Sequence, residues 1–394
     1  VGIGQTEFSK NSGRSELQLA CEATAAAIKD AGLTPADIDG MTTFTMDTSD
    51  EIEIARAVGI KDLTFFSRTP HGGGAAVGVI HQAVMAVATG TATAVVVYRS
   101  LNGRSGARYS EGVSGGATTS DLIHWSWYMP SGLMTPASWV AMFTQRYMYE
   151  TGCTSLDLAV VCVAQRKHAV NNPAAFFHQR PLTLEEHQNA RKIVDPLRLY
   201  DCCQETDGGT ACVITTPERA RDLDCGGAAL ICSVAQAAGA DQEVMTSFYR
   251  PTIASLPEMD LVAKQNWEIS GLSPDDIDAA VIYDAFSSIV LWQLESFGFC
   301  KFGEAKDFIK DGALEVGGRL PTNTHGGQLS EAYIHGMNGV HEVVRLIRGP
   351  SSNQPAKNEH VLVTAAVGIP TRAIIRCRRA DPAPPQPPHA RPRR

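Results

Sequence analysis

The sequence has no run of basic residues before its C-terminal tail and no long apolar segment. Its 34 Lys and Arg are outnumbered by 42 Asp and Glu, which gives a formal net charge of -8. Without a basic patch, the chain lacks the electrostatic footprint that binding to nucleic acid or an anionic membrane requires. The longest mainly apolar stretch, residues 74–88, is interrupted by His81 and is shorter than the roughly 20 residues of a membrane span. We therefore expect a soluble, cytoplasmic chain with neither nucleic acid nor membrane as a partner.

The sequence also lacks any C-x-x-C pair among its ten cysteines. This scatter argues against a zinc ribbon and against the disulfide framework of small secreted proteins. We expect the cysteines to be reduced and mostly buried, because free cysteine packs as a small apolar residue. The pattern indicates no metal site.

What the sequence does contain is an internal repeat. Residues 32–39 read GLTPADID, and residues 271–278 read GLSPDDID. Each copy follows an amphipathic helical stretch, ends it with glycine, opens a short turn with Ser/Thr-Pro and precedes an apolar run. This is the rhythm of a βαβ unit and predicts an α/β fold.

A second pair of similar segments occurs in the same order. His71, Gly72 and Gly73 precede an Ile-His pair at residues 80–81, and a second His-Gly-Gly at residues 325–327 precedes an Ile-His pair at residues 334–335. The first copy runs into a predicted helix at 75–89 and the second into one at 336–348, each followed by a strand. Two matches in one order indicate a gene duplication.

The duplication divides the chain into two predicted halves, residues 1–225 and 226–380. The first half carries an insertion at about residues 100–197 that has no counterpart in the second. It contains a Gly/Ser-rich stretch, a Trp/Tyr/Met-rich stretch and two predicted helices, 135–151 and 154–171. Long insertions of this kind usually shape a binding site. The tail, residues 381–394, is rich in Pro and Arg and is expected to be disordered.

The Gly-rich turns are the first candidate site. A glycine turn that leads into a helix presents unpaired backbone N–H groups and the positive end of the helix dipole, which together hold an anion or an oxyanion. We expect such a role for Gly72, Gly73 and Gly74. The alternative is that these glycines only permit close packing between strand and helix.

The segment GGQLSEAYIHGMNG at residues 326–339 resembles the C-terminal signature of the thiolase superfamily, G-G-x-x-x-x-G-H-P-x-G-A-x-G. In this alignment Tyr333 takes the place of the signature histidine, while Gly336 and Gly339 match. The segment VIYDAFSS at 281–288 is similar to the superfamily's N-E-A-F or H-D-x-F element, with Tyr283 at the Asn or His position and Asp284 at the acid.

Both thiol positions of the superfamily lack cysteine here. The first half's helix begins PHGGGAAVG, with no cysteine between Thr64 and Arg99, and the late Cys-x-Gly loop reads AAVGIP, where only Gly368 fits. Thiolysis and Claisen condensation need a thiolate nucleophile and a second thiol as base. The resemblance therefore implies a thiolase fold, with two duplicated βαβαβαββ halves in five layers (α-β-α-β-α), but excludes ordinary thiolase chemistry.

Within the superfamily the sequence is most similar to the thiolase-like "lipid-transfer protein" group of aldolases in bacterial steroid side-chain degradation. That resemblance implies cleavage of a β-hydroxyacyl-CoA, a 17-hydroxy steroid with a CoA-linked side chain, into propionyl-CoA and a 17-ketosteroid. Such a retro-aldol step needs a base, an oxyanion site and an acid, but no covalent intermediate. No cofactor is expected in this chain, because CoA is part of the substrate.

We expect Tyr283 to act as the base toward the substrate hydroxyl and Tyr333 as the acid toward the enolate; the reverse assignment remains open. A phenol with its ordinary pKa near 10 needs a nearby positive field to act as a base at neutral pH. We expect the C-terminal Gly turn to supply this field. The alternative interpretation of Tyr283 is a strand residue in the core, and that of Tyr333 a helix-start residue.

Further candidates have supporting roles. His71, His325 and His335 lie beside the glycine turns, where a lone histidine is usually a structural donor. Asp284 is expected to accept backbone hydrogen bonds, and the loop at residues 201–209 to be structural.

Two other functions stay open: a non-catalytic carrier of lipid or acyl-CoA, and a decarboxylating or condensing enzyme that uses His325 or His335. Tyrosines at both polar positions favour the aldolase over the carrier. The resemblance also implies a homodimer core and a zinc-ribbon/OB-fold partner related to the hydratase of the preceding step.

Overall fold

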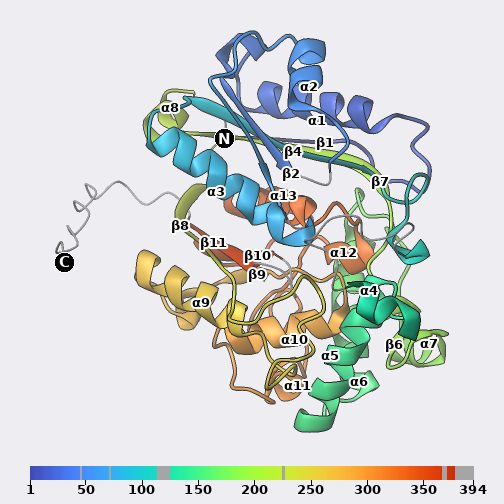
Figure 1. Ribbon diagram of the computed structural model, residues 1–394. Coiled ribbons are helices and arrows are strands. Elements are labelled where there is room, and N and C mark those ends of the chain that lie inside the picture. Colours follow the sequence, from blue (N-terminus) through green and yellow to red (C-terminus); the bar gives the residue numbers. More distant parts are fainter. Residues whose placement is uncertain (45–46, 71, 113–124, 224–226, 366–370, 378–394) are drawn as a thin grey trace, which may run out of the picture.

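The computed structural model describes residues 1–44, 47–70, 72–112, 125–223, 227–365 and 371–377. It contains two large sheets that share one topology, and a small two-stranded sheet (Figure 1). The first sheet has the order β1-β7-β4-β2-β3, and β7 is antiparallel to both of its neighbours. Its strands are β1 (Gly2–Gln5), β2 (Gly40–Phe44), β3 (Phe65–Thr69), β4 (Ala94–Asn102) and β7 (Asp207–Thr215).

The second sheet has the order β8-β11-β10-β9, with β11 antiparallel to both neighbours. An isolated parallel bridge from Ala280 to Thr322 lies beside β9, where β3 lies beside β2 in the first sheet. The second half thus repeats the strand order of the first, with its third strand reduced to one bridge. The strands are β8 (Leu230–Ala237), β9 (Ala279–Val281), β10 (His360–Ala365) and β11 (Thr371–Cys377).

Helices form three layers around the two sheets, which gives the expected five-layer arrangement (Figure 1). The central layer is α3 (Ala75–Ala88) and α13 (Met337–Arg348), and their buried apolar side chains pack with those of both sheets in one core cluster. Two outer layers cover the far faces: α1 (Glu16–Asp30) and α2 (Glu51–Val58) on the first sheet, α9 (Pro257–Ser270) and α10 (Ser287–Ser296) on the second. Because α3 is apolar nearly all round, it is stable only between two sheets.

The repeated octapeptides fold in the same way. Thr34 and Asp37 form a capping box on a short 3-10 turn, and Ser273 and Asp276 form the same box in the second half. The last aspartate of each copy accepts backbone hydrogen bonds at the start of a strand. Asp39 takes those of Thr93 and Ala94, and its counterpart Asp278 takes those of Glu359 and His360. The two halves therefore share local contacts as well as topology.

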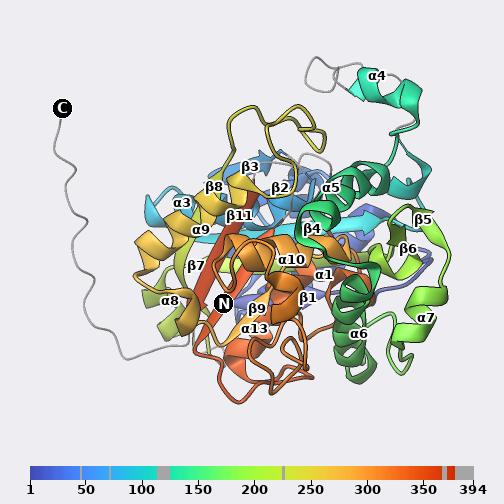
Figure 2. The same cartoon turned by 90° about the horizontal axis from the view of Figure 1, so that it is seen from below.

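The insertion contributes two long helices, α5 (Pro136–Thr151) and α6 (Ser155–Asn171), close to the predicted 135–151 and 154–171. They lie beside α10 on one side of the molecule (Figure 2), and their apolar faces join the core of the second half. The remaining helices and strands are α4 (Trp125–Tyr128), α7 (Leu184–Asn189), β5 (Lys192–Val194), β6 (Leu197–Arg198), α8 (Pro217–Asp222), α11 (Ala305–Phe308) and α12 (Gly327–Ser330).

One expectation about the cysteines is wrong. Cys232, on β8, is disulfide-bonded, whereas seven other described cysteines are free as expected. The predicted boundary between the halves, near residue 225, and the predicted disordered tail lie outside the described residues. No described helix is long and apolar enough to cross a membrane.

Candidate active site

Tyr283 follows β9, and its backbone is held from both sides. Its N–H donates to Thr364 Oγ1 at 3.0 Å, and its carbonyl accepts from Gln293 Nε2 at 2.7 Å. The preceding residue, Ile282, donates its N–H to Asn323 Oδ1 at 2.8 Å. Because all three partners are buried, the loop fixes the direction in which the phenol leaves the strand.

The Tyr283 ring lies between the two glycine turns of the central layer. An ideal Cβ built on Gly73 would lie 2.0 Å from the Tyr283 hydroxyl oxygen, and one on Gly336 would lie 3.1 Å from its ring. Gly73 is in the 3-10 turn that leads into α3, and Gly336 is the N-cap of α13. Helix N-termini carry partial positive charge. A phenolate at Tyr283 would thus face the starts of two helices, one from each half, rather than the C-terminal turn alone.

Tyr333 reaches the same place from the segment that follows α12. Its hydroxyl oxygen lies 3.5 Å from that of Tyr283, although the two residues are fifty positions apart. The Tyr333 N–H donates to Thr206 Oγ1 at 3.0 Å, and its backbone forms a parallel bridge with Glu205. Both tyrosines are largely buried, with exposed fractions of 6% and 8%. The structure therefore brings together the two phenols that the sequence predicted as acid and base.

His335 contacts Tyr333 and is held by an arginine from the other half. Its ring makes an edge-to-face contact with Tyr333 at 5.0 Å between centroids, and its Nδ1 accepts from Arg99 Nε at 3.3 Å. Arg99 forms an ion pair with Asp47 at 3.1 Å, and both side chains are fully buried. Burial and the Arg99 guanidinium hold the pKa of His335 well below its ordinary value. His335 is therefore neutral, and we assign its ring proton to Nε2 because Nδ1 is the acceptor.

Arg99 and Asp47 were not predicted from the sequence. The available signal was a charged residue within the apolar strand sequence AVVVYRSLN of β4. A fully buried arginine needs a partner, so its position predicts an ion pair. The identity of that partner depends on the fold.

Asp284 supports the second-half turn through the expected backbone hydrogen bonds. Its carboxylate accepts from the N–H groups of Gln328 at 2.9 Å and Leu329 at 3.3 Å. A Cβ on Gly327 would lie 2.0 Å from the same carboxylate. Burial raises the pKa of Asp284 to about 7. These contacts place the first turn of α12, and through it Tyr333.

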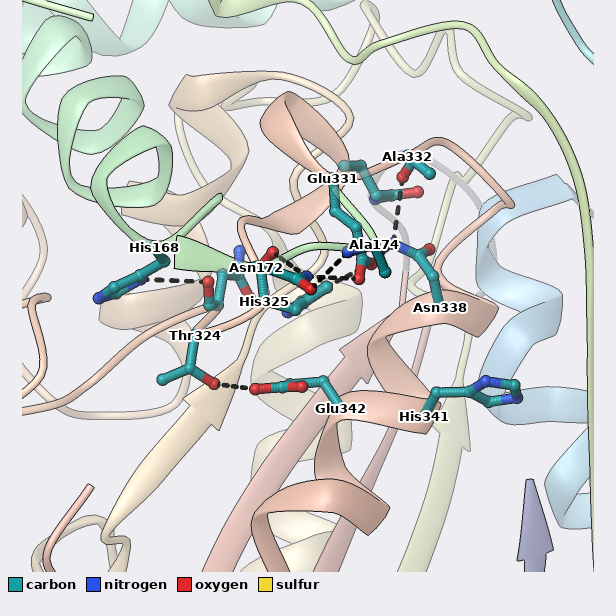
Figure 3. Close-up of polar contacts among 12 residues, drawn as sticks. His168, Asn172, Ala174, Thr324, His325, Glu331, Ala332, Asn338, His341 and Glu342 are labelled. Atoms are coloured by element: carbon teal, nitrogen blue, oxygen red, sulfur yellow. Dashed lines mark hydrogen bonds and ion pairs between the residues drawn. The ribbon is translucent and has the colours of Figure 1, made fainter. Parts of the chain in front are cut away.

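His325 belongs to a polar network behind the turn (Figure 3). Its Nε2 lies 3.8 Å from Glu331 Oε2, and Glu331 also accepts from Asn172 Nδ2 at 2.9 Å and from Asn338 Nδ2 at 2.8 Å. Burial raises the pKa of Glu331 to about 7 and lowers that of His325 to about 3. His325 is therefore neutral, and its carbonyl, which accepts from Asn172 Nδ2 at 2.9 Å, also ties it to this network. This network fixes the backbone conformation of the turn between His325 and Asn338.

Two predicted positions lie outside the described residues: His71 and Gly368. Gly72 and Gly74 belong to the turn at the start of α3 as expected, and Gly72 has a φ of 27°, a conformation that favours glycine. Their role as oxyanion donors stays a prediction.

A buried cluster in the insertion was not anticipated. Cys162, His187 and Asp201 converge within 4.8 Å, which is close enough for three metal ligands. Asp201 Oδ1 lies 3.0 Å from His187 Nε2 and accepts from Ser287 Oγ at 2.6 Å, while Cys162 Sγ donates to the Tyr200 carbonyl. Burial raises the pKa of Cys162 well above its ordinary value, which disfavours the thiolate that a metal requires. These hydrogen bonds join α6 and α7 to the start of α10.

Fold and site together define a class of protein. The two-sheet, five-layer arrangement is that of the thiolases, and the turn where a thiolase carries its nucleophile has glycine, with a phenol packed against it. This is a thiolase fold equipped for acid-base chemistry rather than acyl transfer to a thiol.

Comparison with known proteins identifies the family. The family model "Thiolase C-terminal domain-like" matches residues 239–375. The chain is 61% identical over 377 residues to the steroid side-chain-cleaving aldolase of Thermomonospora curvata, covering 95% of this chain and 96% of that protein. It is 57% identical to the 17-hydroxy-3-oxo-4-pregnene-20-carboxyl-CoA lyase of Mycobacterium tuberculosis, covering 95% and 97%. The chain belongs to the family of steroid side-chain-cleaving aldolases within the thiolase superfamily.

Two solved structures resemble this chain. The Ltp2-ChsH2(DUF35) aldolase superposes with a TM-score of 0.92 at 60% identity, covering 96% of both chains. The Acat5 thiolase of Ascaris suum in complex with coenzyme A superposes with a TM-score of 0.67 at 17% identity, covering 96% of this chain and 98% of that one. The second likeness supports the thiolase fold alone.

Proposed function

We propose that this protein is a retro-aldolase that cleaves the bond between the α and β carbons of a β-hydroxyacyl-CoA steroid side chain. The observation that carries the proposal is the meeting of the Tyr283 and Tyr333 hydroxyls, 3.5 Å apart, against Gly73. By analogy with its relatives, the substrate is a 17-hydroxy steroid with a C20-carboxyl-CoA side chain. The products are propionyl-CoA and a 17-ketosteroid.

The reaction needs only proton transfers and charge stabilisation. A base removes the proton of the β-hydroxyl, whose oxygen becomes the ketone as the carbon–carbon bond breaks. The electron pair of that bond passes to the α carbon and is delocalised into the thioester as an enolate. An acid then protonates the α carbon, which releases the acyl-CoA and balances the proton taken by the base.

We assign the base to Tyr283 and the acid to Tyr333. The hydroxyl of Tyr283 lies against the glycine turn at the start of α3, and its ring lies against the start of α13. This position favours a phenolate at Tyr283. The Tyr333 hydroxyl lies 3.5 Å from that of Tyr283 and can give its proton to the α carbon of the enolate. Backbone amides at Gly72 to Gly74 are the proposed donors to the enolate oxygen.

The test is incubation with the CoA thioester of the β-hydroxy steroid while acyl-CoA and ketone are measured separately. The proposal expects the two products in equal amounts, with Tyr283→Phe and Tyr333→Phe retaining the fold but losing cleavage. A carrier would bind the thioester and return it intact. Release of a free carboxylic acid instead of acyl-CoA would indicate thioester hydrolysis and contradict the proposal.

We also propose that the protein acts as a homodimer bound to a second chain. The edge strand β3 pairs only with β2 among the described residues, and Phe66 on β3 and Ile52 on α2 are exposed at 59% and 62%. An apolar edge of this kind favours pairing with a second copy. The name of the similar Ltp2-ChsH2(DUF35) aldolase includes a second component, which supports a partner chain; we propose that this partner has the zinc-ribbon/OB-fold architecture that the family resemblance implies. Co-expression of the two chains followed by light scattering tests both contacts.

A further inference from the structure

A cluster of cations lies beside the segment that carries Tyr333, although the chain as a whole has a net charge of -8. Its members come from separate parts of the sequence. Lys10, Arg166 and Arg180 share aromatic and backbone contacts, and Arg104 and Arg108 lie near Lys10. We name it the cation cluster; it consists of Lys10, Arg104, Arg108, Arg166 and Arg180.

Lys10 links two parts of the cluster. Its ammonium lies 4.7 Å from the centre of the Phe176 ring, and the Arg180 guanidinium lies 5.4 Å from the same ring. Burial, together with the charges of Arg104 and Arg108, lowers the pKa of Lys10 to about 8. Arg104 and Arg108 therefore lie close enough to Lys10 to act on its charge, while Glu205 acts in the opposite direction.

Arg166 extends the cluster into the insertion. It is only 4% exposed, lies 3.6 Å from the centre of the Phe177 ring and donates to Ser330 Oγ at 2.9 Å. Its Nη1 donates to the Arg180 carbonyl at 3.4 Å. Neither the Ser330 hydroxyl nor this carbonyl balances the charge of Arg166.

The cations of the cluster outnumber the carboxylates that pair with them. Arg108 pairs with Glu205 at 2.8 Å and with Glu111 at 3.9 Å. Within the described part of the chain, no ion pair joins Lys10, Arg104, Arg166 or Arg180 to an acidic side chain. Keeping several cations together without counter-charges costs free energy, and an anion offsets that cost.

The cluster adjoins the catalytic segment through its backbone. Lys10 Nζ donates to the carbonyl of Glu205, the residue that bridges to Tyr333. On the other side, the N–H groups of Phe176 and Phe177 donate to the carbonyls of Glu331 and Ser330 at 2.9 and 3.3 Å. An anion bound here would lie next to the turn that presents the acid.

From this placement we infer that the cation cluster binds the phosphate groups of the substrate's CoA; the inference rests on the proposed function. A CoA thioester carries a diphosphate and a 3′-phosphate at the end of its flexible pantetheine arm, away from the reacting carbons. Arginines and a lysine are the side chains that bind phosphate. The recessed Lys10 and Arg166 suit a slender anionic chain better than the flat surface of a protein.

The binding test uses Lys10→Met/Arg180→Met, which leaves both tyrosines and the Arg108–Glu205 pair in place. Calorimetry with CoA and with pantetheine, on the full chain with its partner, needs no turnover, so it remains informative even if the aldolase proposal fails. We expect the dissociation constant for CoA to rise roughly tenfold or more, where a tenfold change corresponds to about 1.4 kcal/mol of binding free energy. The dissociation constant for pantetheine should not change. Lys10→Arg should restore part of the CoA affinity, and the exposed Lys61→Met should bind CoA as the parent does.

The kinetic test compares the CoA thioester with the N-acetylcysteamine thioester of the same acid. The double variant should raise KM for the CoA thioester alone and leave kcat within about twofold. Equal losses with both thioesters, or no change in CoA affinity, would overturn the inference. So would loss of partner binding with CoA affinity unchanged, because the cluster would then be a surface for the partner.

Discussion

The hydroxyl oxygen of Tyr283 occupies the space into which a side chain on Gly73 would project, since a Cβ there would lie 2.0 Å from it. In the sequence, the glycine turn and the YDAF segment are separate departures from the thiolase pattern. In the structure they are one change, because the phenol can reach the start of α3 only where residue 73 has no side chain.

This relationship predicts the effect of Gly73→Ala. The added methyl group collides with the Tyr283 hydroxyl, so we expect the phenol to be displaced and cleavage to fall roughly 100-fold or more, the scale of losing a general base. Activity assays and thermal unfolding measure the two effects. Adding Tyr283→Phe removes the hydroxyl but keeps ring carbons Cζ and Cε2, which lie 2.3 and 2.7 Å from the built Cβ, so it should recover only part of the stability and none of the activity.

A matched control separates this local collision from general destabilisation. Gly90 has no atom within 4 Å of a built Cβ, but its φ of 73° strains any other residue. Gly90→Ala should lose about 1 kcal/mol of stability and keep its activity. Loss of activity in Gly90→Ala equal to that in Gly73→Ala would contradict the prediction.

The two phenols should behave as one unit. The hydroxyls of Tyr283 and Tyr333 lie 3.5 Å apart. The cleavage rate of the double Phe variant should therefore be only slightly lower than that of the less active single variant. Steady-state rates of all three variants measure this coupling. The exposed Tyr149→Phe is the control, and rate losses that simply multiply would show that the phenols act independently.

The buried pair of Arg99 and Asp47 should stabilise the site from the first half. Arg99→Met leaves Asp47 without its counter-charge, so we expect a loss of about 3 kcal/mol or more in unfolding free energy. Asp47→Asn/Arg99→Met should lose less than the sum of the single variants. Denaturant unfolding measures the free energies of the single and double variants. Arg56→Met is the control, because it breaks only an exposed ion pair with Glu53. A loss under 0.5 kcal/mol, roughly the scale of a surface change, would refute the role.

Glu331 predicts a pH dependence of stability. Burial raises its pKa from 4.5 to about 7, so the folded state holds a proton that the unfolded state releases between these values. Its contribution is fully present below pH 4.5 and is lost as the pH rises to about 7. Relative to Glu331→Gln, the parent should therefore lose up to about 3 kcal/mol of unfolding free energy across this range.

Unfolding free energies of parent and variant from pH 4 to 8 measure this difference. The exposed Glu268→Gln serves as the control and should parallel the parent. A flat difference between parent and Glu331→Gln would show that folding does not shift the pKa of Glu331.

Sequence patterns predicted those parts of the fold that local chemistry dictates. The two octapeptides specify their own capping boxes, so the duplication could be recognised before any contact was known. Tyr283 and Tyr333 were predictable because their segments, VIYDAFSS and GGQLSEAYIHGMNG, resemble two thiolase motifs. The Cys232 disulfide was not, since nothing in the spacing of the cysteines distinguishes that residue.

The rest of the site depends on contacts between distant segments. Arg99 meets His335 only because α3 and α13 pack between the two sheets and align the halves. Likewise, no local pattern marks Glu331 as the centre of a network, because its partners Asn172 and Asn338 come from different elements. Burial, which decides the charge of these groups, is a property of the assembled layers.

The central claim, carbon–carbon cleavage by two phenols without a covalent enzyme intermediate, is tested most directly by one single-turnover experiment. The protein and its partner are mixed with the β-hydroxyacyl-CoA steroid, quenched during product formation and analysed by intact mass together with the products. We predict acyl-CoA and ketone in equal amounts with the protein mass unchanged throughout, and neither product from Tyr283→Phe/Tyr333→Phe. An acylated protein that forms and decays with turnover, or cleavage by the double variant, would contradict this account.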